Sequence, residues 1–571
     1  MAELEKMRRY DAVAIADYYR FRVWTVLWRA FSVALMLGSF VLGLLLDRAF
    51  GRKEINEPKR ATQLRRILTD LGPTFIKVGQ ALSTRPDLIS PKFLDELIKL
   101  QDQLPPFDSR IAQLIVEREL GRTPDEVYSY ISPEPVAAAS LGQVYKARLY
   151  TGEEVAVKVQ RPHLVPIICR DLYLLRWAAG WLAPWLPLNL GHDLTLIVDE
   201  FGSKLFEEID YLNEGRNAET FAANFADDPM VKVPSIYWRY TSTRVLTMEW
   251  IDGIKLTDIE QVKAAGLDSD DLVTIGVSSG LRQLLEFGFF HADPHPGNLF
   301  AMADGAMAYI DFGMMDQLNQ DTKETLVGSV VHLINQEYTK LADDFVRLGF
   351  LTPDVDVRPI VPALEAVFAD AIGASVGDFN FKSITDKFSE VMYDYPFRVP
   401  AKFALIIRSL VTQEGLALTL NPEFKIVEIA YPYVARRLLT GETESLRRRL
   451  IEVLFKDGRF QWQRLENMIR IAQGDQGFNL IPTAGLGVQF LLSDEGHYLR
   501  QQILVALTED NRLHTEEMVR LWSLVKDDLQ PDQLFGAAWS VLANFSRNQA
   551  AALVPAELTA VLSGIGAPPV R

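Results

Sequence analysis

Three polar side chains near the middle of the chain have the types and spacing that phosphoryl transfer requires. Asp293 lies in the run His291-Ala-Asp-Pro-His-Pro-Gly-Asn298, and Asp311 follows after one short hairpin and begins Asp-Phe-Gly. In kinase chemistry one carboxylate orients the acceptor, while an amide and a second carboxylate hold the Mg²⁺ ions that neutralise the phosphates of ATP. We therefore predict Asp293 as the catalytic base or substrate-orienting acid, and Asn298 and Asp311 as metal ligands.

A lysine upstream supplies a further part of such a site. Lys158 ends the run Val155-Ala-Val-Lys158, and its fixed charge would offset the α and β phosphates of ATP. Such a lysine needs an acid to hold it, and Glu214 is the predicted partner, on a helix expected from about Leu194 to Phe225. On one continuous helix Glu208 and Glu214 lie about 120° apart, so Glu208 requires a second basic partner. The alternative is an acidic helix face that is merely solvated.

An alanine run stands where a kinase would carry a glycine-rich loop over the phosphates. Ala137, Ala138 and Ala139 precede Ser140, just before the first predicted strand. Alanine still lets backbone N–H groups approach a phosphate, but each Cβ restricts φ and makes the loop stiffer than glycine would. We predict that these four residues bind the nucleotide together with Lys158 and with Glu249, at the end of a later strand.

The two histidines of the catalytic run do not suggest a metal site, because no third nitrogen or sulfur ligand lies nearby in sequence. We expect a structural hydrogen bond from His291. For His295 we expect loop packing or a phosphate contact.

The length, net charge and cysteine count of the chain argue against several classes of protein. A chain of 571 residues is long enough for two or more hydrophobic cores. Its net charge of -16 argues against a general nucleic-acid binder, which needs a basic surface. The single cysteine, Cys169, excludes an intrachain disulfide framework and a cysteine-based metal site.

An apolar run near the N-terminus indicates a helix that could meet a membrane. Ala30 to Leu46 contains no charged residue, is preceded by Trp24 and Trp28, and is followed by Asp47 and several cations. As a helix it would reach about 25 Å, at the short end of what crosses a bilayer. Three interpretations stay open: a helix buried in the protein or against a partner, a spanning helix, and insertion into the membrane interface.

Alternating branched residues and turn-forming residues predict a sheet, and helical periodicity predicts the helices that follow it. A hairpin is expected from Gln143 to Gln160, turning at Thr151-Gly152, and another strand from Arg244 to Met248. After Asp311-Phe-Gly a helix is expected from Gln320 to Leu341, with no Ala-Pro-Glu signal and no long activation segment. Because protein kinases dock peptides against that segment, protein substrates are disfavoured.

With these residues in hand, the chain resembles the UbiB/AarF family of atypical kinases, also called Coq8-type. The family's Lys-x-Gly-Gln motif reads Lys77-Val-Gly-Gln80 here, and its Glu-x-Asp motif reads Glu208-Ile-Asp210. The alanine loop and the elements around Asp293 and Asp311 also match, over about residues 60 to 440. The resemblance implies that Lys77 and Gln80 act with Glu208 and Asp210 as a regulatory set, and that Lys77 is the partner of Glu208.

The resemblance also implies an α+β, protein-kinase-like two-lobed fold. The Lys77 helix would pack over the site where a peptide otherwise binds, with added N-terminal helices and a helical C-terminal extension. We expect five regions: a membrane-associated helical leader, a Lys-x-Gly-Gln extension, a kinase-like N-lobe, a kinase-like C-lobe and the extension, at residues 1–55, 56–110, 111–250, 251–440 and 441–571.

For function, the resemblance implies Mg²⁺-dependent ATP hydrolysis or phosphorylation that supports prenylquinone biosynthesis or lipid homeostasis at a membrane. The leader is similar to that of members from photosynthetic lineages, which favours plastoquinone or tocopherol over ubiquinone, and a thylakoid or plasma membrane. Expected partners are membrane lipids or prenylquinone precursors and quinone-biosynthesis proteins, with no nucleic acid. The alternative is a lipid-binding chaperone in which the nucleotide only switches conformation. A small-molecule kinase of the aminoglycoside or choline type shares the catalytic run but has no reason to carry Lys77 or the alanine loop.

Overall fold

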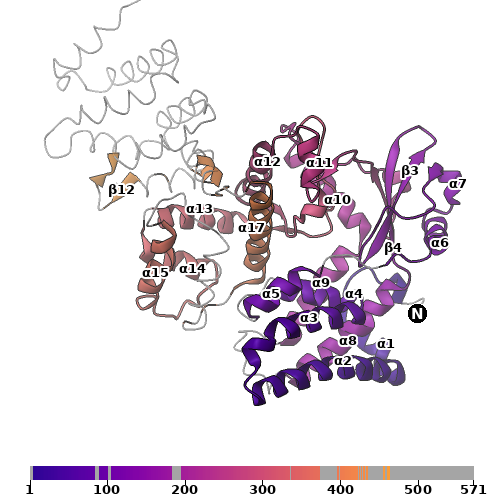
Figure 1. The fold of residues 1–571 in the computed structure, drawn as a ribbon, viewed down its shortest axis with the longest axis horizontal. Coiled ribbons are helices and arrows are strands. Elements are labelled where there is room, and N and C mark those ends of the chain that lie inside the picture. Colours follow the sequence, from indigo (N-terminus) through magenta and orange to yellow (C-terminus); the bar gives the residue numbers. More distant parts are fainter. Residues whose placement is uncertain are drawn as a thin grey trace, which may run out of the picture. The chain divides into compact units, whose positions relative to one another are not determined.

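The computed structural model describes residues 4–83, 89–100, 105–182, 194–334 and 336–372, and then parts of 395–462, of which 399–421 is continuous. The chain forms two compact units, Met1–Val427 and Glu428–Arg571. The first unit is a mixed α+β assembly and contains every predicted site residue (Figure 1).

One antiparallel sheet carries the predicted lysine. Its strands run in the order β1-β3-β4-β6, with β2 paired to β3. Along β4 Val155, Val157 and Val159 are fully buried against α6, so the alternating residue Lys158 faces the other side of the sheet, toward α10. The predicted hairpin and the later strand are confirmed. The elements are α6 (Ser109–Leu120), α7 (Pro124–Val127), β1 (Tyr128–Ile131), β2 (Ala137–Ala138), β3 (Gly142–Leu149), β4 (Glu154–Gln160) and β6 (Val245–Glu249).

Helices from the leader and the Lys-x-Gly-Gln extension form a layer of their own with α8. α2, α3 and α8 lie side by side in Figure 1, and Arg29 of α2 ties them together, since it donates to Asp171 of α8 at 2.7 Å and to the carbonyl of Leu71 at 2.6 Å. Helix α3 ends before Gly72, whose φ of 97° favours glycine, and Pro73 begins α4. The elements are η1 (Leu4–Lys6), α1 (Ala12–Arg20), α2 (Val23–Ala49), α3 (Lys53–Leu71), α4 (Pro73–Leu82), α5 (Pro91–Ile98) and α8 (Leu164–Leu182).

The single helix expected from Leu194 to Phe225 is wrong, because the chain forms two helices there. α9 (Leu194–Glu208) ends before Asp210, which has extended backbone angles and begins α10 (Tyr211–Asn224). The Asp210 carboxylate accepts a hydrogen bond from the N–H of Leu212 at 3.1 Å, as an N-cap residue does. The continuous apolar stripe conceals this capping signal.

Short strands frame the predicted catalytic run in the second lobe. β8 pairs with β11, and a second sheet has the order β5-β10-β9-β7, in which β5 and β10 are parallel. Asp293 and Asn298 lie in the loop between β8 and β9, and Asp311 follows β10. The elements are β5 (Val231–Lys232), β7 (Ile254–Lys255), β8 (Phe289–His291), η5 (Pro296–Asn298), β9 (Leu299–Ala301), β10 (Met307–Tyr309) and β11 (Met315–Gln317). Between β5 and β6, η3 (Trp238–Tyr240) contacts β6 of the first sheet.

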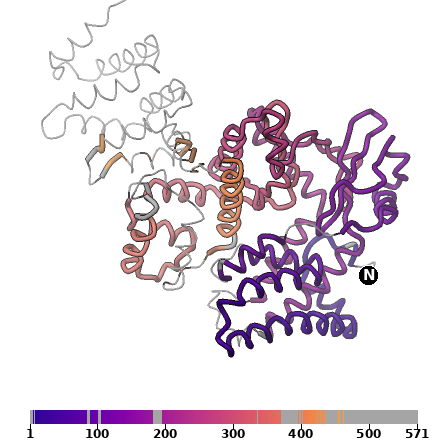
Figure 2. The backbone as a smooth tube through the Cα atoms, in the orientation of Figure 1, coloured from indigo at the N-terminus to yellow at the C-terminus, as the bar shows by residue number. Residues whose placement is uncertain are grey.

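Helices make up the rest of this lobe. The backbone trace in Figure 2 shows α17 returning beside α12, although the two are far apart in sequence. The helix expected from Gln320 to Leu341 is also wrong in its extent, because Gln336 has a positive φ of 56° and separates α13 from α14. The helices are α11 (Ile259–Ala264), α12 (Ser269–Arg282), a π-helical turn (Gln283–Phe287), α13 (Gln320–Ile334), α14 (Tyr338–Arg347), α15 (Ile360–Ile372) and α17 (Ala401–Leu420).

The second unit is described in small part. A hairpin of β12 (Phe455–Lys456) and β13 (Arg459–Phe460) lies beside a small apolar cluster around Leu454. Most of the extension predicted at 441–571 lies outside the described residues.

The break between α9 and α10 leads to a prediction about stability. Asp210→Ala removes the cap of α10 and should lower the free energy of unfolding by about 1 kcal/mol, whereas Asp210→Asn keeps a side-chain acceptor and should stay near the wild type. Urea denaturation of the three proteins measures the difference. Equal losses in both variants would contradict a capping role.

Candidate active site

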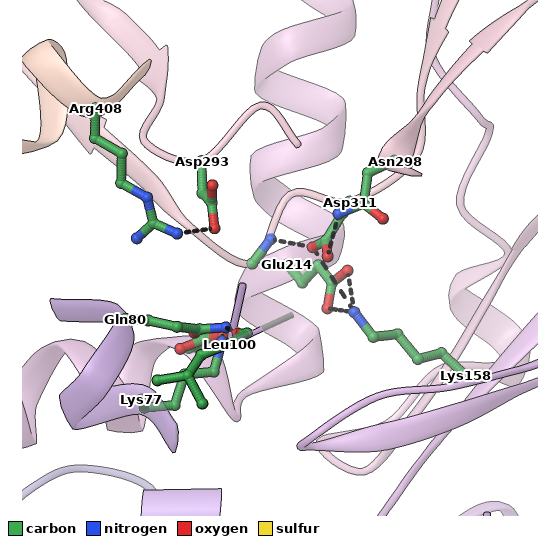
Figure 3. A network of polar contacts seen from close by, with 11 residues as sticks. Lys77, Gln80, Leu100, Lys158, Glu214, Asp293, Asn298, Asp311 and Arg408 are labelled. Atoms are coloured by element: carbon green, nitrogen blue, oxygen red, sulfur yellow. Dashed lines mark hydrogen bonds and ion pairs between the residues drawn. The ribbon is translucent and has the colours of Figure 1, made fainter. Parts of the chain in front are cut away.

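A lysine shared by two carboxylates forms the centre of the site. Lys158 Nζ lies 2.8 and 3.0 Å from the two carboxylate oxygens of Glu214 and 3.8 Å from Oδ1 of Asp311 (Figure 3). The predicted pairing of Lys158 with Glu214 is therefore present. β4, α10 and the segment after β10 each contribute one of the three side chains, so the site depends on the packing of both lobes.

The shared lysine separates the proton affinities of the two acids. Burial raises the pKa of Glu214 to about 7, and the nearby negative charge of Asp311 adds to the shift, although Lys158 opposes it. Asp311 is only partly removed from water, which alone would raise its pKa, but the charge of Lys158 and the N–H of Gly313 together lower that pKa to about 2. Asp311 is thus the carboxylate that stays ionised.

The side-chain amide of Asn298 lies beside the ionised carboxylate of Asp311. Asn298 donates through Nδ2 to Oδ2 of Asp311 at 3.2 Å, and the N–H of Gly313 donates to Oδ1 at 3.0 Å. The Asp311 side chain is 35% exposed, so solvent and ligands can reach it. Mg²⁺ prefers oxygen ligands and usually binds through one or two protein groups plus phosphate and water. Asp311 and Asn298 fit that preference, and their predicted role as metal ligands stays a prediction.

His291 holds the two halves of the catalytic run together. Its Nε2 donates to the carbonyl of Asp311 at 2.7 Å, and its Nδ1 accepts from the N–H of Asp293 at 3.1 Å. These two bonds require the neutral ring with the proton on Nε2, and burial lowers the pKa of His291 in the same sense. The structural hydrogen bond predicted for His291 is present. His295 packs within its own loop, where Nδ1 accepts from the N–H of Gly297 at 3.0 Å.

A second lysine and acid lie beside the first pair. Lys77 of α4 donates to Glu208 at the end of α9, and both side chains are largely buried. The charge of Lys77 also contributes to the lowered pKa of Asp311. Gln80, one turn further along α4, instead donates to the carbonyl of Leu100 at 2.7 Å. Glu208 therefore has the separate basic partner expected for it, although the helix break replaces the 120° argument that suggested one.

The predicted nucleotide loop is tied to the sheet. Ala137 and Ala138 form β2, the N–H of Ala139 donates to the carbonyl of Gly142 at 2.8 Å, and Ser140 is buried. Arg161 donates to the carbonyl of Ala139 at 2.9 Å. This anchor is not apparent from the sequence.

Glu249 ends β6, where its carboxylate pairs with Lys232 at 2.8 Å and accepts from the N–H of Ser235 at 3.0 Å. The nucleotide contacts of Glu249 and of the alanine loop stay predictions.

Asp293 has a partner that sequence reasoning missed. Nη2 of Arg408, on α17, donates to Oδ2 of Asp293 at 2.6 Å (Figure 3). The two residues are 115 positions apart, and no motif surrounds Arg408, so no local signal could have revealed the contact.

The chain is similar to several known proteins. Residues 99–345 match the ABC1 atypical kinase-like domain and residues 364–425 match the UbiB helical domain. The chain is 66% identical to slr1919 of Synechocystis, covering 97% of this chain and 98% of that protein. It is 50% identical to the chloroplastic ACTIVITY OF BC1 COMPLEX KINASE 1 of Arabidopsis thaliana, covering 88% of this chain and 76% of that protein. A solved structure, Rv3197 with erythromycin from Mycobacterium tuberculosis, is 27% identical over 67% of this chain and 99% of that chain, with a TM-score of 0.46.

The raised pKa of Glu214 predicts a dependence of stability on pH. Because the folded protein holds this proton more tightly than the unfolded chain, the contribution is fully present below about pH 4.5 and is lost as the pH rises through 7. Between pH 5 and pH 8 the free energy of unfolding of the wild type should fall by about 2 to 3 kcal/mol more than that of Glu214→Gln. Urea denaturation at both values measures this, and parallel changes in the two proteins would show that Glu214 keeps an ordinary pKa.

Proposed function

This chain belongs to the ABC1/UbiB family of atypical kinases, and on that premise we propose that it binds Mg–ATP and hydrolyses it, or transfers its γ-phosphoryl group to a small or lipid-like acceptor, in prenylquinone metabolism at a membrane. The observation that carries the proposal is the convergence of Lys158, Asp311 and Asn298, whose side chains are linked by contacts of 3.8 and 3.2 Å. A positive charge and two oxygen ligands at this spacing suit a magnesium-bound triphosphate.

Each residue has a separate task in this proposal. Lys158 supplies positive charge to the phosphates and is held by Glu214. Asp311 and Asn298 hold Mg²⁺, which when bound neutralises developing phosphate charge. Asp293 orients the attacking hydroxyl or water. His291 fixes the backbone on both sides, so that Asp293 and Asp311 keep their spacing.

Membrane association is proposed to occur through α2. This helix has 27 residues and a mean hydropathy of 2.0 in its most apolar window. One face packs on α3 and α5, where Phe40 is buried, and its two ends carry charged contacts, Arg29 with Asp171 and Asp47 with Arg60. The other face is exposed, including Trp24 at 83%, and continues through Trp28, Phe31, Leu35, Leu42 and Leu45.

A helix packed against the protein along one side is suited to lie in the membrane interface rather than to cross the bilayer. The net charge of the N-terminal segment supports the same placement of α2 in the membrane interface. Residues 1–66 contain thirteen Lys and Arg against seven Asp and Glu, a net charge of +6, whereas the whole chain carries -16. A basic, apolar segment is attracted to anionic lipid. Chloroplastic and cyanobacterial relatives support a thylakoid or plasma membrane as the location.

The exposed apolar face also favours a second candidate, a nucleotide-switched chaperone that extracts prenylquinone precursors. The two functions differ in what is phosphorylated and in what stays bound. A kinase yields a phosphorylated acceptor, whereas the chaperone co-purifies with prenyl lipid and yields no phosphorylated product; release of ADP and phosphate alone is common to an ATPase and to the chaperone. Mass spectrometry of gently purified protein and of its reaction mixture distinguishes them.

The catalytic proposal is tested by Asp311→Asn. Loss of the carboxylate should lower ATP turnover by at least about 100-fold, because it removes a fixed charge at the magnesium position. Phosphate release is measured with and without liposomes. Asp356→Asn, which changes an exposed acid paired with Arg358, is the matched control and should retain wild-type turnover. Equal turnover in wild type and Asp311→Asn would remove the catalytic proposal.

The membrane proposal is tested by flotation with anionic liposomes. Replacing Trp24, Trp28 and Phe31 with serine should weaken binding by at least about tenfold, because the apolar area that enters the interface is lost. A control triple variant at Ile111, Leu114 and Tyr130 removes exposed apolar side chains from the sheet region and should float like the wild type. If both triple variants behave alike, α2 is not the contact.

A further inference from the structure

We propose that Arg408 is a positioning residue for Asp293, so that the helical domain supplies a part of the catalytic site of the kinase-like domain. This inference rests on the proposed function and extends it to a residue outside the kinase-like match. Asp293 lies within residues 99–345, whereas Arg408 lies within residues 364–425. The contact between them therefore joins the two family segments.

The geometry of the contact is that of a strong ion pair. Nη2 of Arg408 lies 2.6 Å from Oδ2 of Asp293, and the two side chains are 16% and 20% exposed. A charge-assisted hydrogen bond that is mostly shielded from water holds its acceptor more firmly than a surface pair does. Within the described part of the chain, Oδ1 of Asp293 receives no protein hydrogen bond, so it is the oxygen left for an attacking hydroxyl or water.

The backbone of Asp293 is fixed independently of its side chain. Its N–H donates to His291 Nδ1, and its carbonyl accepts from the N–H of His295 at 2.7 Å. These bonds set the position of Cα but leave rotation about χ1 and χ2 free. Arg408 is the group, among the described residues, that restrains the carboxylate itself.

Arg408 is carried by a helix that is itself held rigidly. Ser409 and Gln413 of α17 are buried, and Phe403 and Ile406 pack in the core. At Gly280 of α12 a Cβ would lie 2.3 Å from Oε1 of Gln413, so the two helices approach closely. α17 is apolar enough to resemble a membrane-spanning helix, but half of its most apolar stretch is buried inside the protein. The apolar residues of α17 are better explained by its packing on α12. This packing places Arg408 beside the loop that contains Asp293.

A positioning role makes a kinetic prediction that a structural role does not. In the full-length protein Arg408→Gln should lower kcat for ATP turnover by about 10- to 100-fold while the KM for ATP stays within about twofold, because small misplacement of a catalytic group slows the chemical step. Arg408→Lys should restore part of the rate. Lys402→Gln, which removes a cation from the same helix where it donates to the carbonyl of Gln317, is the matched control.

A double-variant comparison tests whether Arg408 acts through Asp293. In an Asp293→Asn background, Arg408→Gln should cause no further loss of kcat, because the restrained carboxylate is already gone. A loss as large as in the wild-type background, or a large rise in the KM for ATP, would overturn the proposal.

Hydrogen exchange keeps the inference testable apart from turnover. Amides of the loop from 292 to 298 should exchange about tenfold faster in Arg408→Gln than in Lys402→Gln. If the wild type fails to turn over ATP, the proposed function fails, while faster exchange still supports the positioning contact. Unchanged exchange in Arg408→Gln overturns the positioning role whether or not ATP is hydrolysed.

Discussion

The sharing of Lys158 between Glu214 and Asp311 is the interaction on which the rest of the site depends. Lys158 lies between a buried carboxylate, Glu214, and a partly exposed one, Asp311, and the pKa values of the two acids separate: burial raises that of Glu214 to about 7, and the charge of Lys158 helps to lower that of Asp311 to about 2. Glu214 then holds the lysine in place, and Asp311 remains a charged side chain that solvent can reach. Any rearrangement that separates the two lobes would separate these groups, because the lysine belongs to the sheet and Asp311 to the catalytic run.

The break between α9 and α10 solves a second electrostatic problem. Glu208 and Glu214 are close in sequence, and two acids on one helix would compete for one cation. The cap at Asp210 ends the first helix, so that Glu208 meets Lys77 of α4 and Glu214 meets Lys158 of β4. The Glu-x-Asp motif thus combines a salt-bridge residue with a capping residue. Since the charge of Lys77 also contributes to the lowered pKa of Asp311, α4 affects the electrostatics of the site as well as packing beside it.

Local patterns were sufficient to predict the parts of the site that depend on nearby residues. The alternation along β4, the turn at Gly152 and the spacing from Asp293 to Asp311 follow from strand period and motif chemistry, and the structure has each of them. The continuous helices expected through Asp210 and Gln336 were wrong because apolar periodicity continues across both positions, while a cap and a positive φ interrupt the backbone. Tertiary contacts were beyond reach: nothing near Arg161 or Arg408 indicates which loop each will hold.

These long-range contacts explain how the added helices become part of the kinase-like fold. α4 brings Lys77 to Glu208, and α17 brings Arg408 to Asp293, so each added segment contributes one cation paired with one acid of the site. The site is strongly acidic, with four carboxylates at Glu208, Glu214, Asp293 and Asp311. Lys77 pairs with Glu208 and Arg408 with Asp293, while Lys158 lies between the other two acids. Removing the partner of a largely buried acid is destabilising, so the cations on the added helices offset part of the negative charge of the site. α2 keeps an apolar outer face, and two of its three charged residues, Arg29 and Asp47, are paired on the side that packs against the protein.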